Sequence, residues 1–364
     1  MNNKKFIISI FAVFFCYLLI LSLYSCNKEN PVIPPEPPPP PIKPDTVSRY
    51  IWTFYGNIIP MFYIYTADTN IIYVTAAYQL AIYNGVNLTH YDLHDPNFAA
   101  ENVYGFDKNN IFVAGFSIVN NLTVPTFKKI TNGNIETYIL ENENDYIYDI
   151  FITGPNQAWF SVINKSNVYY FDNGIINKFR LSNNDSINIG KFYLDKNKNL
   201  YVFASKFLGA PIGTLYTYKF NSDHFDSLRT DCINLADPTC KNPNIFRCGT
   251  DAVMLPYNTH QKLYYFNGSD WIIHSSMDSI MPFKIGGISR DSLVAIDLKK
   301  TKLYTYGGSK WRYENDSPIL APTIGYQTNI EAKFGNIYLA NSEQHSGPAY
   351  ILIGKPNKNF KNFK

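Results

Sequence analysis

Charged residues, histidine and cysteine are all scarce in this sequence. Asp, Glu, Lys and Arg account for 17% of the 364 residues, and there are 6 His and 5 Cys. The formal net charge is +3, and two of the positive charges, Lys4 and Lys5, precede a hydrophobic run, which leaves about +1 for the rest of the chain. A broad nucleic-acid-binding surface requires a clear basic excess. We therefore expect no nucleic-acid partner.

Catalytic motifs are also missing. The sequence contains no Gly-x-Ser-x-Gly elbow, no P-loop and no dinucleotide-binding glycine pattern. Carboxylates cluster at Glu141, Glu143 and Asp145, which we interpret as a solvated loop between strands, with a calcium site as the alternative. We assign no catalytic, cofactor-binding or metal-binding residue and expect no cofactor.

The densest group of potential metal ligands is His90, Asp92 and His94. On a helix the two histidines would share one face and could hold zinc, but the segment follows an Asn-Gly turn, where a strand is expected. In a strand the three side chains project to one side. Because the Glu of the zinc-protease motif is absent, we interpret this segment as an exposed strand edge or loop.

The few cysteines divide into two groups. Cys16 lies within the hydrophobic run and Cys26 directly follows it, which leaves Cys232, Cys240 and Cys248. Three thiolates lack the fourth ligand of a structural zinc site, whereas an exported protein can form disulfides. We predict one disulfide that closes a loop, with one thiol left over; no bond and a metal site are the alternatives. The spacing does not decide which two cysteines pair.

The only long apolar stretch lies at the N-terminus. Lys4 and Lys5 lead into Phe6–Ser25, an uncharged and mostly apolar run, which is typical of an export signal. The four residues that end at Cys26, Leu-Tyr-Ser-Cys, resemble a bacterial lipobox, in which the cysteine is acylated before cleavage. We predict a lipoprotein signal peptide over residues 1–25 and a lipid on Cys26. An uncleaved membrane anchor and plain secretion are the alternatives.

A proline-rich segment follows the predicted lipid. Nine of the fourteen residues from Pro31 to Pro44 are proline. Such a chain adopts the polyproline II conformation at ~3.1 Å per residue, long enough to hold a domain ~40 Å from a membrane. We interpret residues 26–47 as a membrane tether.

The remainder, residues 48–364, is predicted to be a repeat of strands and turns. Short runs rich in Ile, Val, Tyr and Phe alternate with Asn, Asp and Gly, as is typical of strands joined by tight turns. A polar turn that precedes a β-rich run recurs at intervals that average about 44 residues. These seven turns end at Asn70, Asn110, Gln157, Asn199, Asp251, Asp291 and Asn336.

A second marker has the same period. An aromatic strand enters a glycine turn in most repeats, as in Leu-Tyr-Tyr-Phe-Asn-Gly at 263–268, and Asn-Gly between β runs is a strong hairpin signal. Trp271 and Trp311 each follow such a turn by three residues, and we interpret both as packing residues between repeats. The stretches that interrupt the repeat are 206–213, 232–248 and 341–348, and we expect binding loops there.

A repeat of 40–50 residues without helices predicts a β-propeller with one four-stranded sheet per blade. Seven marker turns predict seven blades, with six and eight as alternatives. The last repeat lacks a fourth strand before Lys364, so we predict that Tyr50–Tyr55 supplies it and closes the ring. The segment 232–248 would then be an insertion between blades.

The motif Leu-Tyr-x-(Tyr/Phe)-x-Gly-x-x-Trp at Leu263 and Leu303 resembles the outer half of a kelch-type blade. Over roughly residues 48–364 the chain resembles the propeller lipoproteins of Bacteroidota and their relatives. This resemblance implies a lipid-anchored protein of the bacterial outer membrane or cell surface. We expect a non-enzymatic monomer that binds a protein or glycan; the alternatives are a polysaccharide hydrolase or lyase with carboxylates in the funnel, and a structural subunit of an envelope complex.

Overall fold

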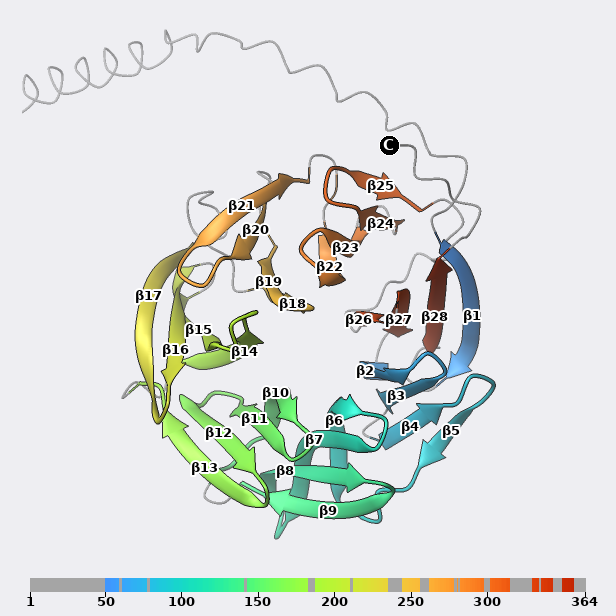
Figure 1. Cartoon of the computed structure of the whole chain (residues 1–364). Coiled ribbons are helices and arrows are strands. Elements are labelled where there is room, and N and C mark those ends of the chain that lie inside the picture. The colour runs from blue at the N-terminus through green and yellow to red at the C-terminus, as the bar shows by residue number, and fades with distance from the viewer. Residues whose placement is uncertain are drawn as a thin grey trace, which may run out of the picture. The chain divides into compact units, whose positions relative to one another are not determined.

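The seven-fold repeat forms a ring of antiparallel sheets in this computed structural model (Figure 1). The structure describes residues 50–356 apart from 59–60, 77–78, 141–142, 183–186, 210–211, 235–243, 256–261, 278–279, 281, 298–301, 315–328, 334 and 343–348. All described residues belong to one compact unit, Pro44–Lys364. Its seven sheets have four strands each, which confirms the predicted all-β propeller with seven four-stranded blades.

In the first three blades, four consecutive strands run outward from the centre of the ring. Blade 1 comprises β2 (Met61–Asp68), β3 (Ile71–Ala76), β4 (Gln79–Tyr83) and β5 (Leu88–Tyr91). Blade 2 comprises β6 (Phe98–Asp107), β7 (Asn110–Val119), β8 (Leu122–Thr131) and β9 (Asn134–Ile139). Blade 3 comprises β10 (Ile147–Gly154), β11 (Gln157–Val162), β12 (Asn167–Asp172) and β13 (Ile175–Arg180).

The next three blades repeat this order. Blade 4 comprises β14 (Asn188–Leu194), β15 (Leu200–Gly209), β16 (Ile212–Asn221) and β17 (His224–Asn234). Blade 5 comprises β18 (Ile245–Cys248), β19 (Asp251–Met254), β20 (Lys262–Phe266) and β21 (Trp271–Ser276). Blade 6 comprises β22 (Pro282–Ser289), β23 (Ser292–Asp297), β24 (Lys302–Tyr306) and β25 (Trp311–Tyr313).

Blade 7 joins the two ends of the described chain. Its strands are β26 (Asn329–Lys333), β27 (Asn336–Ser342), β28 (Ala349–Pro356) and, outermost, β1 (Tyr50–Ile58). β1 pairs antiparallel with β28, with Thr53 opposite Ile353. This pairing confirms the prediction that the segment from Tyr50 supplies the missing outer strand and closes the ring.

The turn markers lie at equivalent places in every blade. Each of the seven polar turns falls between the first and second strands, because β3, β7, β11, β15, β19, β23 and β27 begin at or directly after the marker residue. The Asn-Gly markers join the third and fourth strands. At Asn132–Gly133 both residues have positive φ, 50° and 84°, as this tight hairpin turn requires.

The hydrophobic core consists of seven clusters, each formed where two neighbouring blades pack together. Trp271 of blade 5 lies in one of them, with its ring centroid 5.1 Å from that of Phe203 in blade 4. Trp311 of blade 6 lies in another beside Leu263 of blade 5. Both tryptophans therefore pack between blades as predicted, and burial of these apolar faces stabilises the ring.

One of the three predicted loops is largely strand, because residues 206–209 and 212–213 belong to the long β15–β16 hairpin. In the segment 232–248, Cys232–Asn234 end β17 and Ile245–Cys248 form β18, and residues 235–243 lie outside the described residues. Long hairpins and polar insertions both interrupt the repeat, so the pattern alone did not separate them. Of the third stretch, residues 341–342 end β27 and the rest lies outside the described residues.

Cys232 is disulfide-bonded, whereas Cys248 is a buried free thiol whose pKa is raised by burial. One disulfide with a thiol left over agrees with the prediction, and the partner of Cys232 lies outside the described residues. The predicted signal peptide, Cys26 and the tether also lie outside them. No helix that could cross a bilayer occurs in the part of the chain that the structure describes.

Candidate functional site

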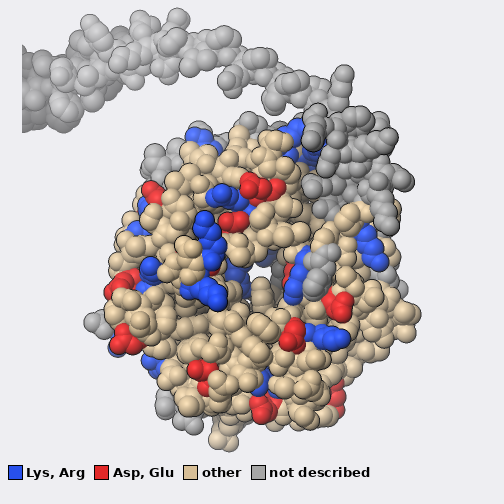
Figure 2. All heavy atoms as spheres, in the orientation of Figure 1, with Lys and Arg blue, Asp and Glu red and all other residues tan. Residues whose placement is uncertain are grey.

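The innermost strands surround a central pocket of about 340 Å³. Lys and Arg side chains lie around the central opening (Figure 2). The lining contains four cationic residues and one acidic residue among those described, and five aromatic rings. The charged residues are Lys191, Arg247, Lys284, Lys333 and Glu331, and the aromatic residues are Tyr63, Tyr65, Tyr104, Phe151 and Phe246. They come from the first strands of all seven blades.

A buried carboxylate holds two of the cations. The Nζ atom of Lys191 lies 2.7 Å from Oδ1 of Asp149, and Nη2 of Arg247 lies 3.3 Å from the same oxygen. Burial has the largest single effect and lowers the pKa of both cations, but the Asp149 carboxylate and the neighbouring tyrosines together raise the pKa of each above its usual value. Arg247 also donates to the carbonyl of Ile150, so it connects blade 5 to blade 3 across the channel.

Two charged residues of β26 bind the backbone of one residue of blade 1, Thr66. The backbone N–H of Thr66 donates to Oε2 of Glu331, and Nζ of Lys333 donates to the carbonyl oxygen of Thr66 at 2.8 Å. Burial raises the pKa of Glu331 to about 7, against the opposing effect of Lys333. The same burial lowers the pKa of Lys333. This carboxyl therefore changes its charge close to neutral pH.

Of the pocket cations, Lys284 has an ammonium group whose pKa is lowered strongly. Burial and the nearby ammonium of Lys191 lower the pKa of Lys284 to about 8. Its Nζ atom lies 5.8 Å from the ring centroid of Phe246. The two lysines therefore repel each other across a partly dehydrated space, and a bound anion would relieve that repulsion.

Of the carboxylate cluster that the sequence indicated, Glu141 lies outside the described residues, whereas Glu143 and Asp145 lie within them. The interpretation of Glu143 as part of a solvated loop is wrong, because its side chain is buried. It accepts hydrogen bonds from Tyr169, Lys178 and Asn167 in the outer hairpin of blade 3. Burial alone would raise the pKa of Glu143, but the hydrogen bonds from Lys178 and Tyr169 hold it below its usual value.

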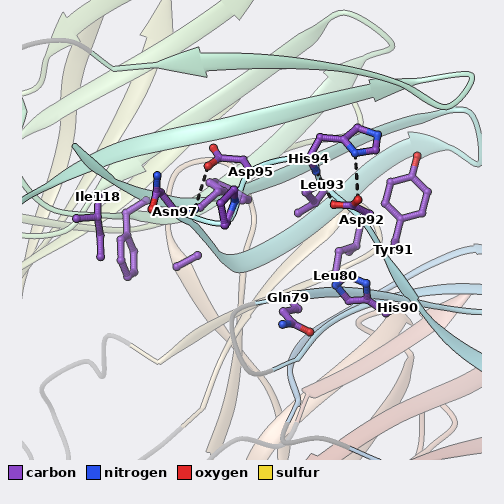
Figure 3. A pocket seen from close by; sticks show the side chains of 14 residues that line it. Gln79, Leu80, His90, Tyr91, Asp92, Leu93, His94, Asp95, Asn97 and Ile118 are labelled. Atoms are coloured by element: carbon purple, nitrogen blue, oxygen red, sulfur yellow. Dashed lines mark hydrogen bonds and ion pairs between the residues drawn. The ribbon is translucent and has the colours of Figure 1, made fainter. Parts of the chain in front are cut away.

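The histidine segment lines a second, wider pocket of about 780 Å³ between blades 1 and 2 (Figure 3). His90 lies on β5, and Asp92 and His94 lie in the loop that follows, all three exposed, as predicted. Asp92 accepts from the backbone N–H of His94 at 2.7 Å and lies 3.1 Å from its Nδ1 atom. In the described part of the chain, no three His, Cys, Asp or Glu residues gather as a metal-ion site would require.

Sequence reasoning did not identify the central pocket. Its charged residues are far apart in the chain, and none belongs to a recognisable motif. Lys191, Arg247 and Lys284 share one signal, which is that each is the single charged residue in the first strand of its repeat. Examples are Lys191 in Asn-Ile-Gly-Lys-Phe-Tyr-Leu and Arg247 in Ile-Phe-Arg-Cys. Innermost strands face the channel, so charges there are a mark of its lining.

Fold and pocket together define a seven-bladed β-propeller with a cationic, aromatic centre. No protein-family model and no curated protein matches the sequence. Solved structures do match. Virginiamycin B lyase from Staphylococcus aureus superimposes with a TM-score of 0.58 at 14% identity, over 83% of this chain and 99% of the lyase chain.

Two further propellers share the architecture. YCF48 bound to D1 peptide has a TM-score of 0.59 at 11% identity, over 87% of this chain and 100% of the other. PorZ, a surface component of the type-IX secretion system of Porphyromonas gingivalis, has a TM-score of 0.52 at 12% identity, over 85% of this chain and 40% of PorZ. At these identities the similarity shows the fold alone.

Proposed function

We propose that this chain is a membrane-tethered, non-enzymatic propeller that binds a protein or glycan of the bacterial envelope through its central pocket. In this proposal a lipid on Cys26 anchors a monomer to the outer membrane or cell surface. The observation that carries the binding function is the excess of cations over carboxylates in the pocket lining. A cationic cleft that is partly dehydrated attracts anionic groups strongly.

The comparisons support a binding function without assigning it. The propeller YCF48 was solved with a bound peptide, and PorZ is a bacterial surface component. The proposal combines two properties of these propellers, which are peptide binding by YCF48 and a bacterial surface location of PorZ. The sequence contributes the third part, because the lipobox and the proline-rich segment predict how such a domain would be anchored.

A polysaccharide hydrolase or lyase is the second candidate, and one observation favours it. The pKa of Glu331 is raised to about 7, which suits a general acid or base. A glycosidase also needs a second carboxylate across the substrate. Asp149 is poorly suited to that role, because Lys191 and Arg247 already occupy it. Among the described residues that line the pocket there is also no histidine to replace it.

A structural subunit is the third candidate. It requires an exposed apolar patch, and the end of the β7–β8 hairpin presents one: Ile118, Val119 and Leu122 are 53%, 41% and 56% exposed. The patch is confined to a single hairpin turn and its two flanking strand ends. An assembly interface is larger than this, so binding through the central pocket is the better-supported function.

The test is extraction of the tagged full chain from its native membrane in mild detergent, followed by mass spectrometry of proteins and glycan analysis of the purified material. We expect one partner in stoichiometric amount. The same preparation is incubated with envelope polysaccharides, and the products are separated by size. Cleavage that is lost in Glu331→Gln and retained in Glu136→Gln, an exposed control on β9, would replace the binding proposal with the enzymatic one.

A further inference from the structure

The cations of the central pocket are held against aromatic rings. The guanidinium carbon of Arg247 lies 4.9 Å from the ring centroid of Tyr104 and 5.1 Å from that of Phe151. The Nζ atom of Lys333 lies 4.2 Å from the ring centroid of Tyr65. These distances are within the range of cation–π attraction. Three rings from three blades therefore fix the positions of two positive charges.

This arrangement leaves few open aromatic surfaces for a sugar. Glycan-binding sites stack sugar rings on open aromatic faces, and here four of the five rings in the lining, all except Tyr63, have a cation over them. The pocket therefore presents mainly positive charge. A lysine ammonium has three donors, and Lys191 has one of them directed at Asp149. The pocket is therefore organised for an anion and not for a neutral ring.

The charge balance agrees with this. Four cations and one carboxylate line the pocket, and Asp149 lies against two of the cations. Glu101 and Asp107 lie outside the lining and act on it through Tyr63 and Tyr65. Among the residues that line the pocket itself, the positive charges outnumber the negative ones. An incoming carboxylate would meet Lys284 and Lys191, whose mutual repulsion it would remove.

On the basis of the binding function proposed above, we infer that the central pocket takes a carboxylate from an acidic peptide segment of a partner protein. The volume of about 340 Å³ lies at the small end of ligand pockets and accommodates a few side chains. Lys284 and Lys191 receive the carboxylate, while Arg247 and Lys333 form the fixed cationic wall. Carboxylates held by desolvated ammonium groups form strong, charge-assisted hydrogen bonds.

The experiment measures binding of a fluorescein-labelled hexaglutamate peptide to the full chain in mild detergent by fluorescence anisotropy. Hexaglutamine is the uncharged control peptide, and trigalacturonate is the competing acidic sugar. We expect hexaglutamate to bind at least tenfold more tightly than hexaglutamine and to be displaced poorly by trigalacturonate. Equal affinity for the two peptides, or efficient displacement by trigalacturonate, overturns the inference.

Matched variants locate the site. Lys284→Gln should weaken hexaglutamate binding at least tenfold, and Lys284→Arg, which keeps the charge, should restore most of it. Lys262→Gln makes the same change at an exposed position at the start of β20 and should leave binding within twofold. Thermal unfolding of Lys284→Gln and Lys284→Arg beside the wild-type protein checks that both variants are folded. Equal losses in Lys284→Gln and Lys262→Gln would show general surface attraction and overturn the inference.

Capture of the native envelope partner distinguishes a wrong inference about the pocket from a wrong proposed function. If Lys284→Gln still captures the native envelope partner at wild-type stoichiometry, the propeller binds through another surface, so the inference is wrong and a binding function stands. If the wild-type chain captures no partner and cleaves a polysaccharide, the proposed function itself is wrong.

Discussion

The ammonium of Lys191 and the carboxylate of Asp149 lie 2.7 Å apart and join the innermost strands of blades 3 and 4. Asp149 is 2% exposed, and it also accepts from the backbone N–H of Phe192 at 3.4 Å and from Arg247 of blade 5. One carboxylate thus connects three consecutive blades at the centre of the ring. Its loss would leave two cations in a dehydrated position without their counter-ion.

Replacing this carboxylate should destabilise the propeller strongly. We expect Asp149→Asn to lower the free energy of unfolding by about 3 kcal/mol, because removal of one partner leaves uncompensated buried charges. Urea unfolding monitored by tryptophan fluorescence measures the change. Asp223→Asn is the matched control, since the Asp223 side chain is 87% exposed and its loss should have little effect. Equal unfolding midpoints for Asp149→Asn and wild type would contradict the role given to Asp149.

The half-buried carboxyl of Glu331 should make stability depend on pH. Its folded-state pKa of about 7 exceeds its ordinary value of 4.5, so between these two pH values the folded protein keeps a proton that the unfolded chain loses. The contribution of Glu331 to stability therefore falls as pH rises through this window, and the loss is complete above pH 7. The nearby charge on Lys333 reduces the effect but does not reverse its sign.

Glu331→Gln should remove this dependence. We expect the variant to be more stable than wild type at pH 8 by about 1–2 kcal/mol, after allowance for Lys333 and partial solvent access, and to differ little from it at pH 5. Chemical unfolding at a series of pH values between 4.5 and 8 provides the measurement. A constant difference between the two proteins across this range would show that Glu331 does not titrate there.

Gly249 permits close contact between blades 5 and 6 beside the pocket. Its φ is 61°, and a Cβ atom there would lie 1.8 Å from the carbonyl oxygen of Ile288. Gly249→Ala should therefore cost at least about 3 kcal/mol of stability, since the strain of the backbone and the clash add. Gly133→Ala is the control, because its φ is also positive, at 84°, but nothing lies within 4 Å.

We expect Gly133→Ala to cost only about 1 kcal/mol, the conformational part of the effect. Thermal unfolding of both variants separates the cost of a positive φ in alanine from the cost of the clash with Ile288. If the two variants melted together, the approach of Gly249 to Ile288 would have no energetic importance.

Cys26→Ala tests the predicted anchor. The variant should accumulate as an unprocessed precursor without lipid, because acylation of the cysteine precedes cleavage. Metabolic labelling with an alkyne fatty acid, followed by electrophoresis, reports both properties. Cys16→Ala, within the apolar run of the signal, should be labelled and processed normally. Normal labelling of Cys26→Ala would disprove the lipoprotein prediction.

The sequence was sufficient for the architecture because the repeat is local. A turn such as Asn110 and a hairpin such as Asn132–Gly133 are encoded by neighbouring residues, and their spacing alone predicted the blades. The pocket is not local. Asp149 and Arg247 are about one hundred residues apart and meet only because the ring closes.

The burial of a loop residue such as Glu143 could not be predicted from the sequence either. Glu143 lies among polar neighbours, which favoured a solvated interpretation, but the outer hairpin of blade 3 brings Tyr169 and Lys178 against it. Whether a polar side chain is exposed depends on what a distant strand places over it. Periodicity carries no information about that.

The pairing of β1 with β28 also determines how the propeller would carry mechanical load. A force applied through the residues before Tyr50 enters the propeller at β1, the outermost strand of blade 7, which is paired with β28. The component of that force along β1 would load the hydrogen bonds between the two strands together, in shear, because these bonds run perpendicular to the strands. A molecule pulling on the central pocket of an anchored propeller would thus be resisted by blade 7, in which both ends of the described chain are paired.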